Sequence, residues 1–243
     1  MSPRRRADRL LVERGVFDSR AKAQAAIAAG LVTADDVPVR KASDEIPLAA
    51  SLRAEPAHPW VSRGGVKLAA ALDYFGFDPA GHVCLDVGAS TGGFTQVLLA
   101  RGARRVYAVD VGRGQLHASL RNEAAVIAFE ETDIRSLKPG RPLDPPDFLV
   151  IDVSFISLKL VLPPAAALLR APSRLIALIK PQFEAGRRHL KKGIVRDPQV
   201  HAAVCEDIAG FVTRLGWTVG GVIPSPIAGG EGNREFLLGA SRD

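Results

Sequence analysis

Cysteine and long apolar runs are both scarce in this sequence of 243 residues. The two cysteines, Cys84 and Cys205, cannot form the disulfide framework of a small secreted protein, so we expect both to be reduced. The longest apolar tract, 158–169, contains one lysine and two prolines and is too short to cross a bilayer. The first ten residues, M-S-P-R-R-R-A-D-R-L, lead into charged sequence and not into the apolar h-region of a secretory signal. We therefore expect a cytoplasmic protein without a membrane segment.

Acidic residues are fewer than basic ones. Lys and Arg total 32 against 26 Asp and Glu, which leaves a formal net charge of +6. This balance favours a polyanionic partner such as a nucleic acid, although basic surfaces also occur without one. The length is sufficient for one large domain and a small one.

The stretch V-C-L-D-V-G-A-S-T-G-G-F-T at 83–95 carries the clearest local signal. A short apolar run contains Asp86 near its end, glycines follow, and apolar residues then return at helical spacing. A buried strand, a glycine-rich turn and a helix are typical of the opening unit of a nucleotide-binding α/β domain. We predict that Gly88 turns the backbone sharply and that Gly92 and Gly93 let a ligand lie against main-chain N–H groups.

The spacing of these glycines distinguishes between ligands. It is G-x-x-x-G-G, not the G-x-G-x-x-G of a pyrophosphate site, so a nicotinamide-dependent oxidoreductase is disfavoured. Asp86 ahead of the turn suits the amino-acid end or the ribose of a ligand without phosphate, such as S-adenosylmethionine. A turn that binds no ligand is the alternative, because any strand-to-helix turn favours glycine.

Four more apolar runs are predicted to be strands of the same sheet, and each has a charged residue at or near its end. They are 105–110, 126–133, 148–154 and 175–180. A helix near 198–215, a strand at 217–222 and a closing strand at 234–238 follow. Alternating strands and helices predict an open parallel sheet, whose ligands bind beyond the carboxyl ends of the strands.

Charged residues at these strand ends are the candidate ligand contacts. Asp110, about 20 residues beyond the first strand, is predicted to accept both ribose hydroxyls. Asp133 is expected near an adenine amino group, and Asp152 and Lys180 close the next two strands. Charges scattered along loops would be the alternative, but they would not end successive strands in this regular way.

Two lysines and two carboxylates are the candidate catalytic groups. Lys67, expected on the first turn of a helix, joins Asp152, Lys180 and Glu235 at one edge of the predicted sheet. For methyl transfer to a sugar hydroxyl, Lys180 would orient and deprotonate the 2′-hydroxyl and Asp152 would hold Lys180. Lys67 and Glu235 would complete the network around the ribose. A purely structural cluster of ion pairs is the alternative.

Residues 4–32 are predicted to form two short basic helices, the first beginning with Leu10–Val12 and stopping at Gly15, the second capped by Ser19. The pattern R-L-L-V-E-R-G-x-x-x-S-R-x-x-A-x-x-x-I-x-x-G-x-V resembles an S4 RNA-binding module. The segment A-D-D-V-P-V-R-K-A that follows departs from the V-N-G turn that is usual in such modules. Residues 52–59 are predicted to be a linker. The resemblance assigns these basic residues to RNA: Arg4, Arg6, Arg9, Arg14, Arg20 and Lys22.

Motifs along nearly the whole chain resemble the TlyA (haemolysin A-like) family. They are S-R-G-G-x-K-L, L-D-V-G-A-S-T-G-G-F-T, V-Y-A-V-D-V-G-R-G-Q-L, I-D-V-S-F-I-S-L, L-I-K-P-Q-F-E and G-N-R-E-F-L. The resemblance implies an α+β S4 domain (1–57) joined to an FtsJ-like domain (60–243) with the Rossmann-like class I methyltransferase fold, an α/β fold with a seven-stranded, mostly parallel sheet. It further implies S-adenosylmethionine-dependent methylation of cytidine 2′-oxygens in ribosomal RNA, of the large subunit alone or of both subunits.

The family's site residues carry over onto matching positions. Its Lys-Asp-Lys-Glu tetrad corresponds to Lys67, Asp152, Lys180 and Glu235. Its cofactor contacts correspond to Asp86, Gly88, Ala89, Ser90, Thr91, Gly92, Gly93, Phe94, Asp110, Val111, Asp133, Ile134 and Asp152. Two positions depart from the family pattern: Asp133 replaces an asparagine, and His58 replaces the arginine of an R-x-W-V linker.

A second basic run follows L-I-K-P-Q-F-E and is predicted to contact the RNA backbone beside the site. With Arg63, its predicted RNA contacts are Arg187, Arg188, Lys191 and Lys192. A solvated loop is the alternative. We expect a monomer that acts on ribosomal RNA or ribosomal subunits and does not bind membranes. Two other functions remain open here: a non-catalytic RNA-binding or ribosome-assembly protein, and a membrane-active haemolysin.

Overall fold

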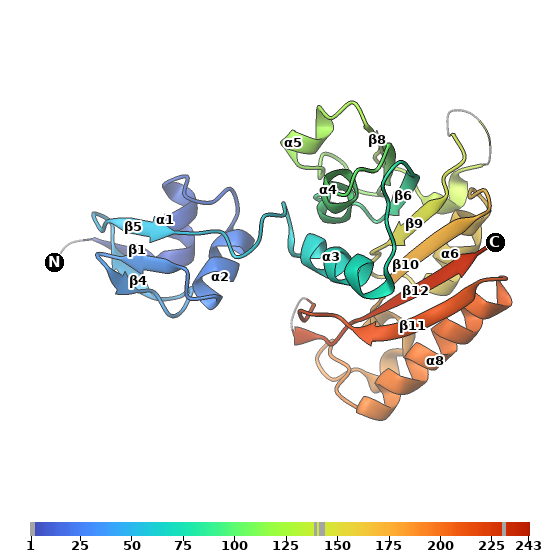
Figure 1. The fold of residues 1–243 in the computed structure, drawn as a ribbon. Helices are drawn as coiled ribbons and strands as arrows, with labels where there is room; N and C mark the ends of the chain where they lie inside the picture. The colour runs from blue at the N-terminus through green and yellow to red at the C-terminus, as the bar shows by residue number, and fades with distance from the viewer. Residues whose placement is uncertain (1–2, 139, 141–143, 230–231) are drawn as a thin grey trace. The chain divides into compact units, whose positions relative to one another are not determined.

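The computed structural model describes residues 3–138, 140, 144–229 and 232–243. The chain divides into two compact units, Met1–Pro59 and Trp60–Asp243, and each is described by itself (Figure 1). No helix in the described ranges has the length and apolar content that a membrane crossing requires.

The first unit combines two helices with two small antiparallel sheets. Its elements are β1 (Arg4–Arg6), α1 (Ala7–Glu13), α2 (Arg20–Ala28), β2 (Val32–Ala34), β3 (Val37–Pro38), β4 (Glu45–Pro47) and β5 (Leu52–Ala54). β1 pairs with β4, and the order in the other sheet is β3-β2-β5. Apolar residues of both helices, including Leu11 and Ile27, form its core with residues of the strands. The hydroxyl of Ser19 accepts a hydrogen bond from the N–H of Lys22 and caps α2, as predicted.

Three details of this unit differ from or add to the sequence prediction. α1 begins at Ala7, three residues before the predicted start at Leu10. Leu52–Ala54, predicted to be linker, is strand β5, paired antiparallel with β2. A three-residue strand has too little alternation to be recognised without its partner. The hairpin between β2 and β3 turns through Asp35 and Asp36, both at positive φ, where glycine or asparagine is usual.

The second unit is a seven-stranded sheet with helices on both faces. Its elements are α3 (Arg63–Phe75), β6 (Val83–Val87), α4 (Gly93–Ala100), β7 (Arg105–Val109), α5 (Ala118–Arg121), β8 (Val126–Phe129), η1 (Ile134–Ser136), β9 (Phe148–Ile151), α6 (Leu158–Ala166), β10 (Ser173–Ile179), α7 (Pro181–Glu184), η2 (Arg187–His189), α8 (Pro198–Arg214), β11 (Thr218–Pro224) and β12 (Phe236–Arg242). The strand order is β11-β12-β10-β9-β6-β7-β8, and only β12 runs antiparallel to its neighbours. The predicted seven-stranded, mostly parallel sheet is confirmed.

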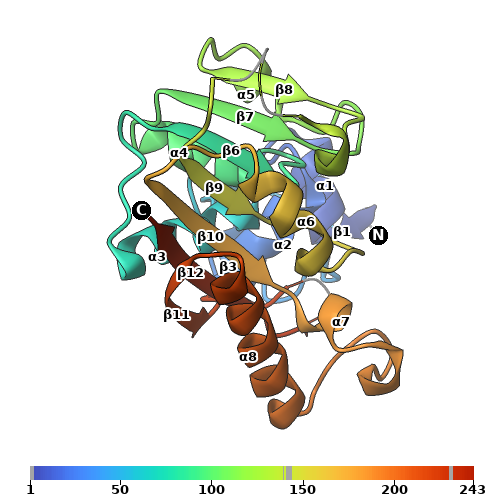
Figure 2. The same ribbon diagram turned by 90° about the vertical axis from the view of Figure 1, so that its right-hand side faces the viewer.

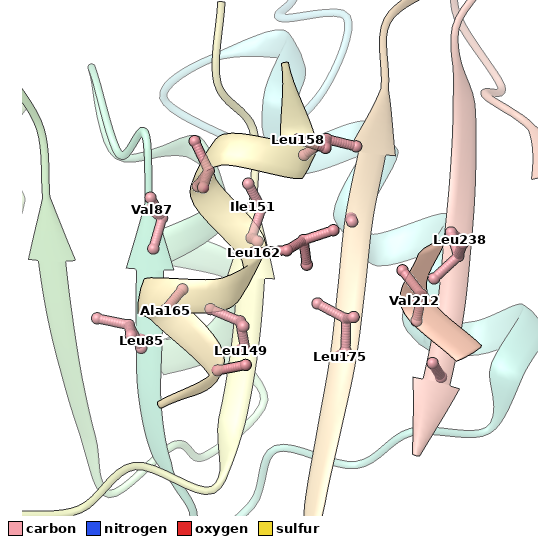
Figure 3. Close-up of a cluster of buried hydrophobic side chains, with 14 of the residues drawn as sticks. Leu85, Val87, Leu149, Ile151, Leu158, Leu162, Ala165, Leu175, Val212 and Leu238 are labelled. Atoms are coloured by element: carbon pink, nitrogen blue, oxygen red, sulfur yellow. The ribbon is translucent and has the colours of Figure 1, made fainter. Parts of the chain in front are cut away.

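Strand side chains alternate between two apolar layers, which is why the strands read as nearly continuous apolar runs. In β6, Leu85 and Val87 face the layer beneath α6 and α8, whereas Cys84 faces the layer beneath α3 and α4. Figure 3 shows Leu158 and Leu162 of α6 packed onto strand side chains such as Leu149. Figure 2 views the sheet with α6 and α8 on the near side.

The start of this unit is held by Trp60, which packs against the core layer beneath α3 and α4. A Cβ on Gly65 would overlap the Trp60 side chain, so the close contact requires glycine at that position. The sequence predicts that Lys67 lies on the first turn of its helix. Because α3 begins at Arg63, Lys67 instead lies on the second turn. The closing strand begins at Phe236, so Glu235 precedes β12 directly instead of lying inside it.

Candidate active site

Three adjoining pockets lie at the carboxyl ends of β6, β7, β9 and β10. The carboxylate pocket, of about 350 Å³, is lined by residues that include Asp110, Val111, Asp133, Ile134 and Asp152. The glycine pocket, of about 180 Å³, is lined by residues that include Gly88, Ala89, Thr91, Gly93 and Phe94. The aromatic pocket, of about 430 Å³, is lined by residues that include Lys67, Phe155, Lys180, Phe183 and Glu235. Ser154 lines all three pockets, which therefore adjoin, and together they are called the cleft below.

The glycine turn brings the end of β6 against the end of β9. Gly88 has a φ of 84°, and a Cβ there would overlap the carbonyl of Asp152. The N–H groups of Gly88 and Ala89 both donate to the carbonyl of Val109 at the end of β7, at 2.9 and 3.2 Å. The turn is thus fixed to both neighbouring strands, which positions Asp152 beside it.

The sequence predicts that Gly92 and Gly93 leave space for a ligand, but in the structure the chain itself occupies the space beside both. A Cβ on Gly92 would overlap the side chains of Leu116 and Leu120, and Gly92 lines none of the three pockets. A Cβ on Gly93 would overlap the Ser62 hydroxyl, although Gly93 does line the glycine pocket. Packing of the chain against itself therefore accounts for glycine at both positions.

Asp86 lies beneath the cleft and does not line it. It is fully buried inside β6, and its Oδ2 accepts a hydrogen bond from Thr95 Oγ1 at 2.6 Å. Its Oδ1 has no hydrogen-bond partner within the described part of the chain. Burial raises the pKa of Asp86 to about 7. Direct ligand contact, as predicted from the sequence, is not what this position offers, because the carboxylate is fully buried and lines none of the three pockets.

Asp110 organises the carboxylate pocket from the end of β7. Its two oxygens accept hydrogen bonds from the N–H groups of Ser90, at 2.8 Å, and Gly112, at 2.7 Å. Asp133, on the same pocket, binds the guanidinium of Arg135 at 2.6 Å, and this hydrogen bonding lowers the pKa of the Asp133 carboxyl. All predicted cofactor contacts except Asp86 and Gly92 line the cleft.

Two ion pairs form the charged part of the cleft. Lys180 Nζ lies 2.6 Å from Asp152 Oδ1 and donates a hydrogen bond to Ser154 Oγ at 2.9 Å. The contact with Asp152 Oδ1, a buried oxygen, is an ion pair. Lys67 Nζ donates to Glu235 Oε2 at 2.5 Å.

The fold positions these four groups from separate elements. Asp152 directly follows β9 and Lys180 directly follows β10, which are adjacent parallel strands, so their carboxyl ends meet. Lys67 comes from α3 and Glu235 from the residue before β12. Lys67, Lys180 and Glu235 are each less than one tenth exposed. Each charge has an opposite charge beside it, which makes burial of these three groups tolerable.

Two aromatic side chains beside these ion pairs were missed by sequence reasoning. Phe155 is 91% exposed and has a φ of 65°, a conformation that is unusual for a bulky residue. Its ring lies 5.1 Å from that of Phe183, centroid to centroid. Strained backbone at a cleft is often found at functional sites. The only sequence signal was that both residues fall in motifs that also contain Asp152 or Lys180.

The predicted RNA contacts of the second unit lie at the surface. Arg63 is exposed at the start of α3, and the basic loop (187–196) exposes its other predicted contacts, Arg187, Arg188, Lys191 and Lys192. This loop borders the cleft, because Gly193 lines the aromatic pocket. Asn233 ties the loop to the segment that carries Glu235: it accepts from the N–H of Val195 at 3.3 Å and donates to the carbonyl of Gly193 at 3.2 Å.

The basic residues of the first unit are partly engaged within that unit. Buried Asp8 accepts hydrogen bonds from Arg6 and Arg20, chiefly Arg6, and these hold its pKa well below the usual range. Arg14 donates to the carbonyls of Leu48 and Ala50. The remaining predicted contacts are Arg4, bound to the Glu45 carbonyl, Lys22, paired with Asp18, and Arg9, which is exposed and has no polar partner among the described residues.

Comparison with known proteins relates this chain to methyltransferases. Residues 60–242 match the model of the FtsJ-like methyltransferase family. The chain is 46% identical to the Bacillus subtilis (strain 168) protein YqxC over 98% of this chain and 85% of that one. It is 43% identical to the Mycobacterium tuberculosis (strain ATCC 25618 / H37Rv) 16S/23S rRNA (cytidine-2′-O)-methyltransferase TlyA, over 98% and 90%. A solved structure from Streptococcus thermophilus is 40% identical with a TM-score of 0.78, covering 100% of this chain and 90% of that one.

Proposed function

Because the chain belongs to the FtsJ-like methyltransferase family, we propose that it methylates the 2′-hydroxyl of a cytidine in ribosomal RNA, using S-adenosylmethionine. The observation that carries this proposal is the presence of two ion pairs at one cleft, the buried pair Lys67–Glu235 and the pair of buried Lys180 with half-buried Asp152. The name of the relative from Mycobacterium tuberculosis supports both the nucleoside and the RNA.

The carboxylate pocket fits the cofactor. It combines apolar walls, such as Val109, Val153 and Ile156, with Asp110 and Asp133, and this mixture suits a nucleoside with a purine face and ribose hydroxyls. Asp152 lines both the carboxylate pocket and the glycine pocket, next to Ser154, which also lines the aromatic pocket. When bound, S-adenosylmethionine supplies an electrophilic methyl group on a sulfonium, which is its own leaving group.

The chain's own residues have two tasks, alignment and removal of one proton. Well-aligned reactants gain roughly 7–11 kcal/mol, whereas a general base contributes about 10²–10⁴-fold in rate. Lys180 Nζ, in its neutral form, would accept the 2′-hydroxyl proton. Asp152, 2.6 Å away, would stabilise the ammonium that results. Lys67 and Glu235, which also line the aromatic pocket, would orient the ribose.

The aromatic pocket suits the target nucleotide. Enzymes that act on a nucleotide within folded RNA rotate it out of its stack and hold the base against aromatic side chains. The exposed ring of Phe155, braced by Phe183, offers such a face beside Lys180. The target base would therefore stack on Phe155 while its ribose reaches Lys180.

The first unit and the basic loop would supply contacts to the RNA backbone. We propose that the first unit is an S4-like RNA-binding domain, in which exposed Arg9 contacts phosphate while Arg6, Arg14 and Arg20 also hold the fold together. The basic loop would contact RNA beside the cleft. Ribosomal subunits are cytoplasmic, so we propose that the protein acts in the cytoplasm, as a monomer.

Transfer of a labelled methyl group tests the proposal. Purified protein is incubated with labelled S-adenosylmethionine and with ribosomal subunits from cells that lack the gene, and the methylated ribose is then mapped in 16S and 23S RNA. We expect label on a cytidine 2′-oxygen of 23S RNA, with or without a second site in 16S RNA. Absence of ribose methylation in both RNAs, with cofactor binding intact by calorimetry, would favour a non-catalytic RNA-binding protein.

A further inference from the structure

The carboxamide of Gln182 is unsatisfied at its oxygen. Gln182 is half-buried, and its Oε1 is buried without a hydrogen-bond partner within the described part of the chain. A buried carbonyl oxygen without a donor is unfavourable, and in native proteins such a group calls for an explanation. Gln182 lines the aromatic pocket, so a bound molecule there can reach it.

The backbone that carries Gln182 is held in place. Glu184, two residues further along α7, accepts hydrogen bonds from Ser157 Oγ at 2.6 Å and from the N–H of Leu158 at 2.8 Å. These bonds tie α7 to the start of α6. Lys180 directly precedes α7 and pairs with Asp152. The amide is therefore carried by a short segment anchored at both ends.

The arrangement matches what a flipped nucleotide requires, an inference that rests on the proposed function. In the proposed function the ribose binds at Lys180 and the base stacks on Phe155. The polar edge of the base then needs a hydrogen-bonding partner. Gln182 lines the same pocket, whereas Glu184, the other polar residue of α7, already binds Ser157 and Leu158. A carboxamide offers one acceptor and two donors in a single plane, and it can pair with two adjacent atoms of a base.

We propose that Gln182 selects the base whose ribose is methylated. Its buried Oε1 accepts a hydrogen bond from the exocyclic amino group of cytosine, and its Nε2 donates to the adjacent ring nitrogen N3. Uracil presents a carbonyl oxygen where cytosine presents the amino group. With the amide kept in its observed orientation, Oε1 would face another acceptor, and pairing with uracil would require the amide to turn by 180°. Gln182 thus determines base specificity without taking part in methyl transfer.

Replacement of Gln182→Met tests this inference, because methionine keeps the length of the side chain and removes the amide. Single-turnover rates are measured on subunits that carry the mapped target cytidine and on subunits in which that nucleotide is uridine. The exposed Gln199→Met on α8 is the matched control. A bidentate base contact corresponds to roughly 5–150-fold discrimination. We expect the wild type and the control to prefer cytidine within this range and Gln182→Met to lose most of the preference.

The outcomes separate this inference from the proposed function. Loss of preference that comes from slower reaction on cytidine, with the uridine rate unchanged, supports the assignment. An equal fall on both substrates, or an unchanged preference, overturns it while ribose methylation by the wild type stands. If the wild type methylates neither substrate, the proposed function fails as well. Calorimetric binding of S-adenosylmethionine, expected to be unchanged in Gln182→Met, shows that the variant is folded.

Discussion

Lys67 Nζ and Glu235 Oε2 lie 2.5 Å apart, although 168 residues separate them in the chain. The contact joins the second turn of α3 to the entry of β12. Both side chains are less than one tenth exposed, so neither charge can be solvated by water if its partner is lost. This pair therefore affects stability and, in the proposed function, the ribose site.

We expect Glu235→Leu to lower the free energy of unfolding by about 3–5 kcal/mol, because it leaves the Lys67 ammonium buried without a partner. Adding Lys67→Met in the same chain removes that charge and should restore most of the stability. Urea unfolding of both variants and the wild type measures this. The double variant should still fail to methylate RNA; a wild-type rate would make the pair purely structural.

Replacing Phe155 should separate activity from stability. We expect Phe155→Gly to leave the free energy of unfolding unchanged or raised, because glycine adopts a φ of 65° without strain. Methyl transfer should fall roughly 5–150-fold, the range for loss of one base stacked on an aromatic ring. Phe155→Tyr, which retains a ring, is the control and should stay within a few fold of the wild type. Equal rates in all three proteins would exclude stacking.

Asp86 should make stability depend on pH. Burial raises its pKa from 3.8 to about 7, so between roughly pH 4 and pH 7 the folded chain keeps a proton that the unfolded chain has lost. The contribution of Asp86 to the free energy of unfolding is therefore greatest below pH 4. It decreases as the pH rises, by at most about 1.4 kcal/mol per pH unit, and is lost above pH 7.

The neutral variant Asp86→Asn isolates this contribution from those of other carboxyls. We expect its free energy of unfolding, relative to that of the wild type, to increase between pH 5 and pH 7.5. Urea titrations of both proteins at several pH values provide the measurement. A difference that does not change with pH would mean that Asp86 is ionised throughout this range.

The basic loop should contribute to the salt dependence of RNA binding. Each phosphate contact adds about one unit to the slope of the logarithm of affinity against that of salt concentration. We expect Arg187→Gln with Lys191→Gln to reduce the slope by about two. Arg104→Gln is the control, because exposed Arg104 precedes β7 and so lies at the opposite edge of the sheet. The same reduction in the control would show a general charge effect instead of a loop contact.

Much of the sheet could be predicted from the sequence because its strands are buried on both faces and read as apolar runs. The adjacency of Asp152 and Lys180 followed from the same pattern, since the carboxyl ends of parallel strands share one edge. The N-terminal β5 could not be predicted, because a strand of three residues depends on pairing with β2, which is distant in the chain.

The depth of a side chain below the surface was harder to predict than its neighbourhood. Asp86 stands next to the glycine turn in sequence, but it lies inside β6 and points into a covered layer. Gly92 looked like a ligand contact, whereas Leu116 and Leu120, more than 20 residues away, fill the space beside it. Neither fact is encoded in local spacing.

The uncharged residues that would contact the base, Phe155 and Gln182, were also not predicted from the sequence. Apart from their place in motifs that contain Asp152 or Lys180, an exposed phenylalanine and an uncharged glutamine carry no signal, and their importance emerges only when Phe155 and Gln182 line one pocket with Lys180. Asn233 is similar: its role as a tie between the basic loop and the strand that follows Glu235 depends on contacts about 40 residues away in the chain.

The central claim is that Lys180 takes the proton from the 2′-hydroxyl. Single-turnover methyl transfer to ribosomal subunits, at saturating S-adenosylmethionine, tests it with Lys180→Met and Lys180→Arg. Arginine keeps the positive charge but does not give up its proton, so it cannot act as a base. We predict that both variants bind the cofactor and lose at least about 10²-fold in rate. A rate near that of the wild type in either variant would contradict the account.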